Sequence, residues 1–154
     1  QGPNVMQGYW NKPEQTDAVL QDGWYRTGDI GYLDSEGYLY LVDRAKDMII
    51  SGGENVYCSE VEEVIYQNPK VLEATVFGVP NDQWGEQVHA VVVPRDESLT
   101  SEELIDFCRE SLGGYKLPRS VEFRSTELPK SGPGKVLKRE LRAPYWEGKD
   151  RSIN

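Results

Sequence analysis

The first part of the chain carries short hydrophobic runs separated by polar turns. Residues Trp24–Arg26 and Ile30–Leu33 are β-like, and the turn residues 34–37 lead into another β-like run at Tyr38–Val42. These runs predict a hairpin, preceded by a short helix over Glu14–Leu20. So few short strands do not close a hydrophobic core. We therefore expect this part to belong to a larger body of protein.

A different pattern begins after a short apolar strand at Met48–Ile50. Val61, Val64 and Ile65 recur at the spacing of one helix face. Ser59 and Glu62 stand where a capping box would begin this helix, with a hydroxyl and a carboxylate each accepting from a backbone amide. The loss of such a Ser59 cap should cost about 1 kcal/mol.

Three runs rich in β-branched or aromatic residues predict strands at Val71–Val79, Gln87–Val93 and Val121–Phe123. The second run is apolar on both of its faces, which indicates a sheet that is covered at least partly on both sides. A second capped helix is expected within Thr100–Gly114, ending at its two glycines. The pattern predicts an α+β fold, a small mixed sheet with packed helices, preceded by the hairpin segment.

A dense charged run, residues 43–47, separates the two patterns. Such a run between apolar strands is the best candidate for a boundary between packed units. We expect residues 1–43 to end one domain and residues 44–154 to form another.

Composition narrows the functions that are open to the chain. Its 154 residues contain 17 Lys and Arg against 26 Asp and Glu, a net charge of −9, which disfavours general binding to nucleic acid or anionic membranes. No apolar run approaches the roughly 20 residues of a transmembrane helix.

Cys58 and Cys108 lack the spacing of a metal site, and His89 is expected to be a half-exposed strand residue, so no metal site is predicted. Two separated thiols favour a reducing, cytoplasmic location. Because Gln1 stands in place of Met, we expect a cut or processed chain.

Three side chains have the setting for binding an anion or a sugar. Lys135 ends a loop of residues 128–135 that is rich in Gly and Pro, so it suits a phosphate or carboxylate, or else it is a solvated surface lysine. Asp29 suits a pair of ribose hydroxyls or a turn cap. Arg44 suits phosphate or hydroxyl oxygens, or a surface ion pair with Asp47.

Three ordered motifs resemble the C-terminal part of the adenylate-forming superfamily, which includes acyl-CoA synthetases, peptide-synthetase adenylation domains and beetle luciferases. They are YRTGD at 25–29, DRAKDMIISGGENVY at 43–57 and PKSGPGK at 129–135, and the resemblance covers nearly the whole chain. Residues 115–118 look more like an acyl-CoA synthetase than a peptide-synthetase domain, and residues 144–148 resemble the tail of fatty-acyl-CoA ligases.

The resemblance implies an acid–thiol ligase. A carboxylate reacts with ATP and Mg²⁺ to give an acyl-adenylate, and coenzyme A then displaces AMP. Asp29 would bind the ribose hydroxyls, Arg44 would assist at the ribose, Asp43 would be the hinge, and Lys135 would be the adenylation lysine. Lys46 would act near the reacting centre.

The same resemblance assigns the loop of Gly52, Gly53, Glu54 and Asn55 to the path of the incoming thiol; by itself, Gly52-Gly53 suits an ordinary tight turn. The family's phosphate loop, magnesium-binding acid and acyl pocket lie in a large N-terminal domain and have no counterpart in this sequence. We therefore expect a fragment that is inactive alone and whose partner is that N-terminal domain. The alternative is a non-catalytic accessory module that binds a nucleotide or a partner protein. Within the enzyme class, the alternatives are a luciferase-like oxidation and a carrier-protein thiol acceptor.

Overall fold

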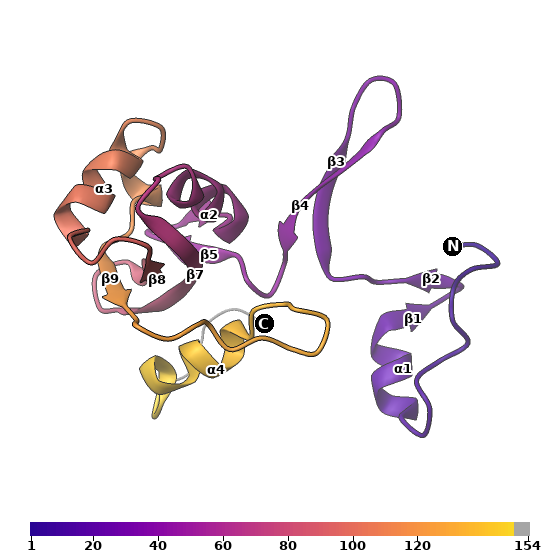
Figure 1. Ribbon diagram of the computed structural model, residues 1–154. Helices are drawn as coiled ribbons and strands as arrows, with labels where there is room; N and C mark the ends of the chain where they lie inside the picture. The colour runs from indigo at the N-terminus through magenta and orange to yellow at the C-terminus, as the bar shows by residue number, and fades with distance from the viewer. Residues whose placement is uncertain (150–154) are drawn as a thin grey trace.

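The computed structural model describes residues 1–149 of an α+β chain (Figure 1). The N-terminal elements extend away from the rest of the chain, and the end of the last of them lies next to helix α2 (Cys58–Tyr66). They are α1 (Pro13–Val19), β1 (Leu20–Gln21), β2 (Trp24–Tyr25), β3 (Asp29–Leu33) and β4 (Leu39–Arg44).

The predicted hairpin is present as the antiparallel pair β3–β4. Asp34 shapes its turn, since one carboxylate oxygen accepts from the amides of Glu36 and Tyr38, each at 2.9 Å. Tyr32 and Tyr40 stack across the strands with ring centroids 5.1 Å apart. None of residues 1–48 is buried, which agrees with the expectation that this segment has no core of its own.

The remaining elements form one mixed sheet with helices. They are β5 (Ile49–Ser51), β6 (Glu54–Val56), α2 (Cys58–Tyr66), β7 (Val71–Asn81), β8 (Gly85–Pro94), α3 (Ser101–Arg109), β9 (Ser120–Phe123) and α4 (Lys138–Arg142), with 3-10 turns at Gly114–Lys116 and Ala143–Trp146. The strand order is β6-β5-β8-β7, and β9 pairs with β8 in parallel. The three strands predicted at Val71–Val79, Gln87–Val93 and Val121–Phe123 are confirmed as β7, β8 and β9, whereas β6 was not expected.

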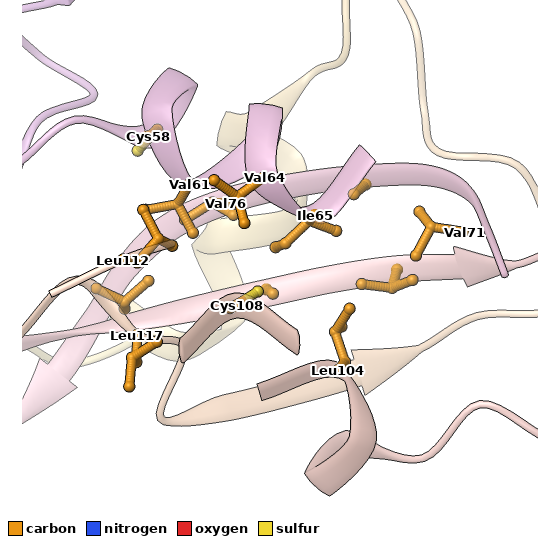
Figure 2. Packing of buried hydrophobic residues seen from close by; sticks show 14 of the residues in the cluster. Cys58, Val61, Val64, Ile65, Val71, Val76, Leu104, Cys108, Leu112 and Leu117 are labelled. Carbon is orange, nitrogen blue, oxygen red and sulfur yellow. The ribbon is translucent and has the colours of Figure 1, made fainter. Parts of the chain in front are cut away.

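The sheet is covered on both faces, as the apolar runs indicated. On one face α2 and α3 pack with Val61, Ile65, Leu104 and Cys108 in a single buried cluster (Figure 2). On the other face a smaller cluster joins β7 and β8 to the C-terminal segment. Its buried members are Phe77, Val79, Val91, Val93, Leu128 and Leu141. The second cluster fixes the position of α4 on the sheet.

The prediction that Ser59 caps its helix is wrong. The N-cap residue of α2 is Tyr57, and no side-chain cap bond is made there. The Ser59 hydroxyl instead donates to the carbonyl of Val42 at 2.6 Å, and the Ser59 amide donates to Oδ2 of Asp43 at 3.2 Å. The local pattern fails because β4 approaches α2 and supplies acceptors from 16 and 17 residues away.

Two further details differ from the sequence prediction. Thr100 does cap α3, since its Oγ1 accepts from the amide of Glu103, but α3 ends at Arg109 rather than at the later glycines. His89 is 3% exposed rather than half-exposed. Its ring lies 4.7 Å from that of Tyr145, because the C-terminal turn folds back over this face of the sheet.

Candidate functional site

Two adjoining cavities lie where the end of β4 meets the Lys135 loop and α4. The smaller, of about 420 Å³, is lined in part by Asp29, Asp43, Arg44 and Lys135. The larger, of about 550 Å³, is lined in part by Arg44, Lys46 and Lys135. The structure therefore brings together five of the nine predicted site residues, although they are as much as 106 positions apart in the chain.

Asp29 and Arg44 meet because the hairpin register places them directly opposite each other. Arg44 Nε lies 3.4 Å from Oδ1 of Asp29, so Asp29 replaces Asp47 as the partner suggested for Arg44. The turn before β3 is closed by Thr27, whose hydroxyl accepts from the Asp29 amide at 3.0 Å. The Asp29 carboxylate is thus not the turn cap. Both side chains keep substantial exposure, 45% for Arg44 and 30% for Asp29, so the pair itself adds little stability.

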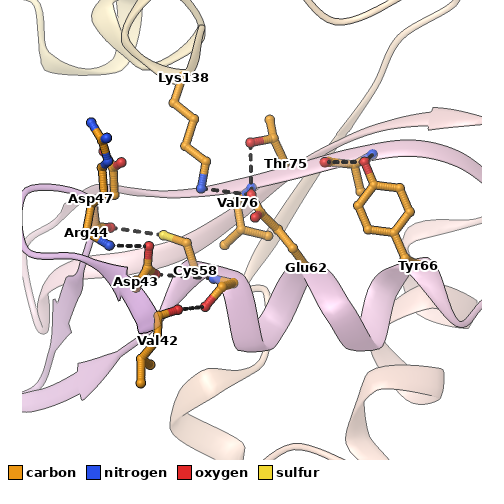
Figure 3. A network of polar contacts seen from close by, with 12 residues as sticks. Val42, Asp43, Arg44, Asp47, Cys58, Glu62, Tyr66, Thr75, Val76 and Lys138 are labelled. Carbon is orange, nitrogen blue, oxygen red and sulfur yellow. Dashed lines mark hydrogen bonds and ion pairs between the residues drawn. The ribbon is translucent and has the colours of Figure 1, made fainter. Parts of the chain in front are cut away.

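Asp43 connects the end of β4 to the beginning of α2. One carboxylate oxygen accepts from the Arg44 amide at 2.7 Å and the other accepts from the Ser59 amide at 3.2 Å (Figure 3). An anionic oxygen at a helix N-terminus is favoured by the unpaired amides and the helix dipole. The predicted hinge residue is therefore a contact point between the hairpin segment and the C-terminal body.

Lys135 is presented by a tight loop that forms its own hydrogen bonds. The Ser131 amide donates to the Lys135 carbonyl and the Gly134 amide donates to the Ser131 carbonyl, each at 2.8 Å. Gly134 has φ = +83°, a region that other residues rarely adopt. Lys135 is exposed, and within residues 1–149 its ammonium group has no hydrogen bond or ion pair. The loop thus holds a free cation at the rim of both cavities.

Lys138, one helical turn further on, is held in a polar cluster. Its Nζ lies 2.8 Å from Oε1 of Glu62 on α2, and the same oxygen accepts from the Thr75 hydroxyl at 3.0 Å and from the Val76 amide at 2.7 Å (Figure 3). Burial lowers the pKa of Lys138, but the charges facing it, among them Glu62 and Asp47, raise that pKa more, so it stays protonated. Lys138 therefore fastens α4 to α2 and β7, while Lys135 stays available.

The other predicted residues, Gly52 to Asn55, lie in a separate place. Gly52 and Gly53 form the turn between β5 and β6, with φ of +62° and +87°, and this loop lines neither cavity. The Gly52 amide donates to the carbonyl of Trp84 at 2.9 Å, and a Cβ on Gly52 would lie 2.7 Å from that indole ring. The guanidinium of Arg119 lies 5.1 Å from the centroid of the same ring. Nothing in the sequence pattern indicated that Trp84 supports this loop.

The sequence also did not indicate that α4 borders the candidate site. Arg139 and Arg142 line the larger cavity together with Lys138. The only signal was the run of basic residues after Lys135. Within residues 1–149 no group of three or more His, Cys, Asp or Glu side chains is placed to hold a metal ion. In the same range no helix is long and apolar enough to cross a membrane.

The fold is that of the small C-terminal domain of adenylate-forming enzymes. Residues 60–135 match the family model for the AMP-binding enzyme C-terminal domain, and the chain belongs to this family. The similarity to relatives covers more of the chain than these residues, as the following matches show.

Among curated relatives, a long-chain-fatty-acid–CoA ligase of Yersinia pestis is 57% identical over 141 residues, which are 92% of this chain and 25% of that protein. A feruloyl-CoA synthase of an Amycolatopsis species is 54% identical over 145 residues, 94% of this chain and 29% of that protein. The chain thus spans about a quarter of the length of these relatives.

Solved structures give the same result. ATP-bound MatB of Rhodopseudomonas palustris matches with a TM-score of 0.86 and 38% identity, over 97% of this chain and 30% of that one. The o-succinylbenzoate-CoA synthetase MenE of Bacillus subtilis, in complex with its acyl-adenylate, matches with a TM-score of 0.85 and 44% identity, over 92% of this chain and 29% of that one.

Proposed function

We propose that this chain is the C-terminal part of an ATP-dependent acyl-CoA synthetase and that it supplies the adenylation lysine, Lys135. The observation that carries the proposal is the unpaired Lys135 ammonium at a cavity shared with Asp29 and Arg44. The names of the relatives favour a fatty or aromatic carboxylic acid as the substrate. A reducing, cytoplasmic location fits the two free thiols.

In this proposal the first step joins the acid to the nucleotide. A carboxylate oxygen of the substrate attacks the α-phosphorus of ATP, and pyrophosphate leaves with the electron pair of the broken P–O bond. Asp29 would accept hydrogen bonds from the ribose hydroxyls, and Arg44 would hold Asp29 in place. The Lys135 ammonium would lie between the carboxylate and the phosphate oxygens. At about 4 Å and an effective dielectric constant near 20, one such charge pair contributes roughly 4 kcal/mol.

Magnesium would screen the phosphate charges when it is bound. Residues 1–149 offer no acidic cluster for it, so we propose that the cation and most of the nucleotide are held by the domain that the relatives have in addition to this one. Residues 1–43, which have no core, would be the end of that domain, and residues 44–154 would be the part that moves.

The second step transfers the acyl group to coenzyme A. The thiol sulfur attacks the acyl carbonyl carbon and loses its proton, and AMP leaves. The loop of Gly52, Gly53, Glu54 and Asn55 would line the path of the thiol. Because this loop borders neither cavity, the two steps need two arrangements of the C-terminal domain, related by rotation at Asp43. Lys46, which lines the larger cavity, would act near the reacting centre in one of them.

The test uses the parent enzyme, by which we mean the full-length synthetase that contains this chain, and it measures the two half-reactions separately. Lys135→Ala should lower the rate of acyl-adenylate formation by about a thousandfold, the equivalent of roughly 4 kcal/mol, and leave thioester formation from supplied acyl-adenylate unchanged. Lys12→Ala, at an exposed lysine beside α1, is the matched control and should change neither step. An equal loss in both half-reactions for Lys135→Ala would remove this lysine from its role.

A second experiment separates the fragment from an accessory module. The 154-residue chain alone should show no ATP–pyrophosphate exchange, and exchange should appear in the parent enzyme. Robust exchange by the isolated chain would refute the proposal that it needs the rest of the enzyme. If the parent enzyme transfers acyl groups to a carrier protein but not to coenzyme A, the thiol acceptor is a carrier protein and not coenzyme A.

A further inference from the structure

The larger cavity has a charge opposite to that of the chain as a whole. Its lining includes six basic side chains and two acidic ones, whereas the whole chain has a net charge of −9. The basic residues are Arg44, Lys46, Lys135, Lys138, Arg139 and Arg142, and the acidic ones are Asp47 and Glu62. A cavity with one sign of charge concentrates ligands of the opposite sign. Its occupant should therefore be strongly anionic.

The basic side chains at this cavity are not equivalent. Lys138 forms an ion pair with Glu62, with Nζ 2.8 Å from Oε1. Arg44 forms an ion pair with Asp29, with Nε 3.4 Å from Oδ1. Lys135 and Arg139 are both exposed and have no ion pair or side-chain hydrogen bond to any residue of the described range 1–149. Lys46 and Arg142 each already interact with another group. Lys135 and Arg139 are therefore the side chains whose charge is still available to a ligand.

The position of Arg139 relative to Lys135 is set by rigid neighbours. Arg139 lies in the first turn of α4, which is fastened by Lys138 to Glu62 and by the buried Leu141 to the sheet. The Lys135 loop is anchored just before by Lys130, which pairs with Glu73 on β7. Binding of a ligand to both cations therefore costs little conformational entropy, because the backbone that carries them is already ordered.

We propose that this cavity binds a polyphosphate, either free pyrophosphate or the identical terminal part of ATP, and that Arg139 and Lys135 are the ligands that this chain supplies to it. A guanidinium forms paired hydrogen bonds to two oxygens of one phosphate, and an ammonium acts as a compact charge on the next. A volume of about 550 Å³ is within the range of small-molecule sites and leaves room for two linked phosphates. The role of this binding in catalysis, holding the leaving pyrophosphate, rests on the proposed function.

The test measures binding of pyrophosphate to the 154-residue chain by calorimetry at low ionic strength. Arg139→Gln should weaken pyrophosphate binding by about tenfold, as expected for loss of a charge-assisted contact. Arg95→Gln removes another exposed arginine, from the loop after β8 and outside this cavity, and should weaken binding less than about twofold by general electrostatics. Circular dichroism is the check that both variants fold.

Three ligands distinguish the source of the phosphate. Pyrophosphate and ATP should both lose affinity with Arg139→Gln, and AMP, which lacks the linked phosphates, should bind weakly to every variant. AMP that binds as tightly as ATP would mean that the nucleoside is recognised, which overturns the proposal. An equal effect of Arg139→Gln and Arg95→Gln overturns it as well, as does the absence of pyrophosphate binding to the unaltered chain.

These outcomes are separate from those for the proposed function. If Lys135→Ala abolishes adenylation in the parent enzyme but the chain binds no pyrophosphate, the polyphosphate site is wrong and the synthetase assignment stands. If Arg139-dependent pyrophosphate binding is found in a parent enzyme that forms no acyl-adenylate, the site stands and the assigned reaction is wrong.

Discussion

The ion pair between Lys138 and Glu62 provides the sharpest test of how the candidate site is held together. Lys138→Met keeps most of the side-chain volume and removes the charge. It leaves the Glu62 carboxylate, 20% exposed, with the Thr75 hydroxyl and the Val76 amide as its remaining donors. The substitution separates the charge of Lys138 from its packing.

The size of the effect follows from distance and burial. At 2.8 Å and an effective dielectric constant near 20, the attraction is about 6 kcal/mol, and desolvation of both groups offsets a part of it. Removing one partner of a buried pair costs about 3–5 kcal/mol. Because Lys138 is 19% exposed and Glu62 keeps two neutral donors, we expect the free energy of unfolding to fall by about 3 kcal/mol.

The assay is equilibrium urea unfolding, with Lys70→Met as the matched control. Lys70 Nζ also lies 2.8 Å from a carboxylate oxygen, that of Glu103, but its side chain is 32% exposed and that of Glu103 is 46% exposed. Such an exposed pair is worth less than about 1 kcal/mol. Equal losses of stability in the two variants would refute the reasoning that burial makes the Lys138 pair strong.

Three further predictions concern other parts of the chain. Burial lowers the pKa of His89, the single histidine, so the folded chain binds fewer protons than the unfolded one, and the free energy of unfolding should fall as the pH drops from 7.5 to 5.5. Urea unfolding of His89→Gln should lack this loss. Burial raises the pKa of Cys58 to about 12 and of Cys108 to about 11, so both thiols should react with a disulfide reagent only after denaturant is added. Gly52→Ala should lower the melting temperature through its positive φ and the nearby indole ring, whereas Gly114→Ala, with open space around it, should not.

The elements with a strong local signal could be read from the sequence. The β3–β4 hairpin, the long strands β7 and β8 and the two helices on one face of the sheet follow from periodicity and turn residues. The register of the hairpin, which places Asp29 opposite Arg44, needed the actual pairing. A shift of one residue would have pointed these side chains to opposite faces.

The failures have one physical origin. Ser59 and Glu62 have the spacing of a capping box, but both side chains find stronger partners in distant segments: Ser59 bonds to the carbonyl of Val42, and Glu62 bonds to Lys138. His89 is buried because the C-terminal turn with Tyr145 folds over it. A short pattern predicts what a side chain does locally, and it cannot include competitors that arrive from elsewhere in the chain.

By itself, then, the sequence determined the α+β class, the family and the identity of the residues that carry the candidate chemistry, because each depends on local order and composition. The tertiary structure alone decided which lysine is free and which is neutralised. Lys135 and Lys138 are only three residues apart, but the loop presents the first to solvent, and the packing of α4 on α2 places the second against Glu62. The difference is one of electrostatic environment, and the folded neighbours create that environment.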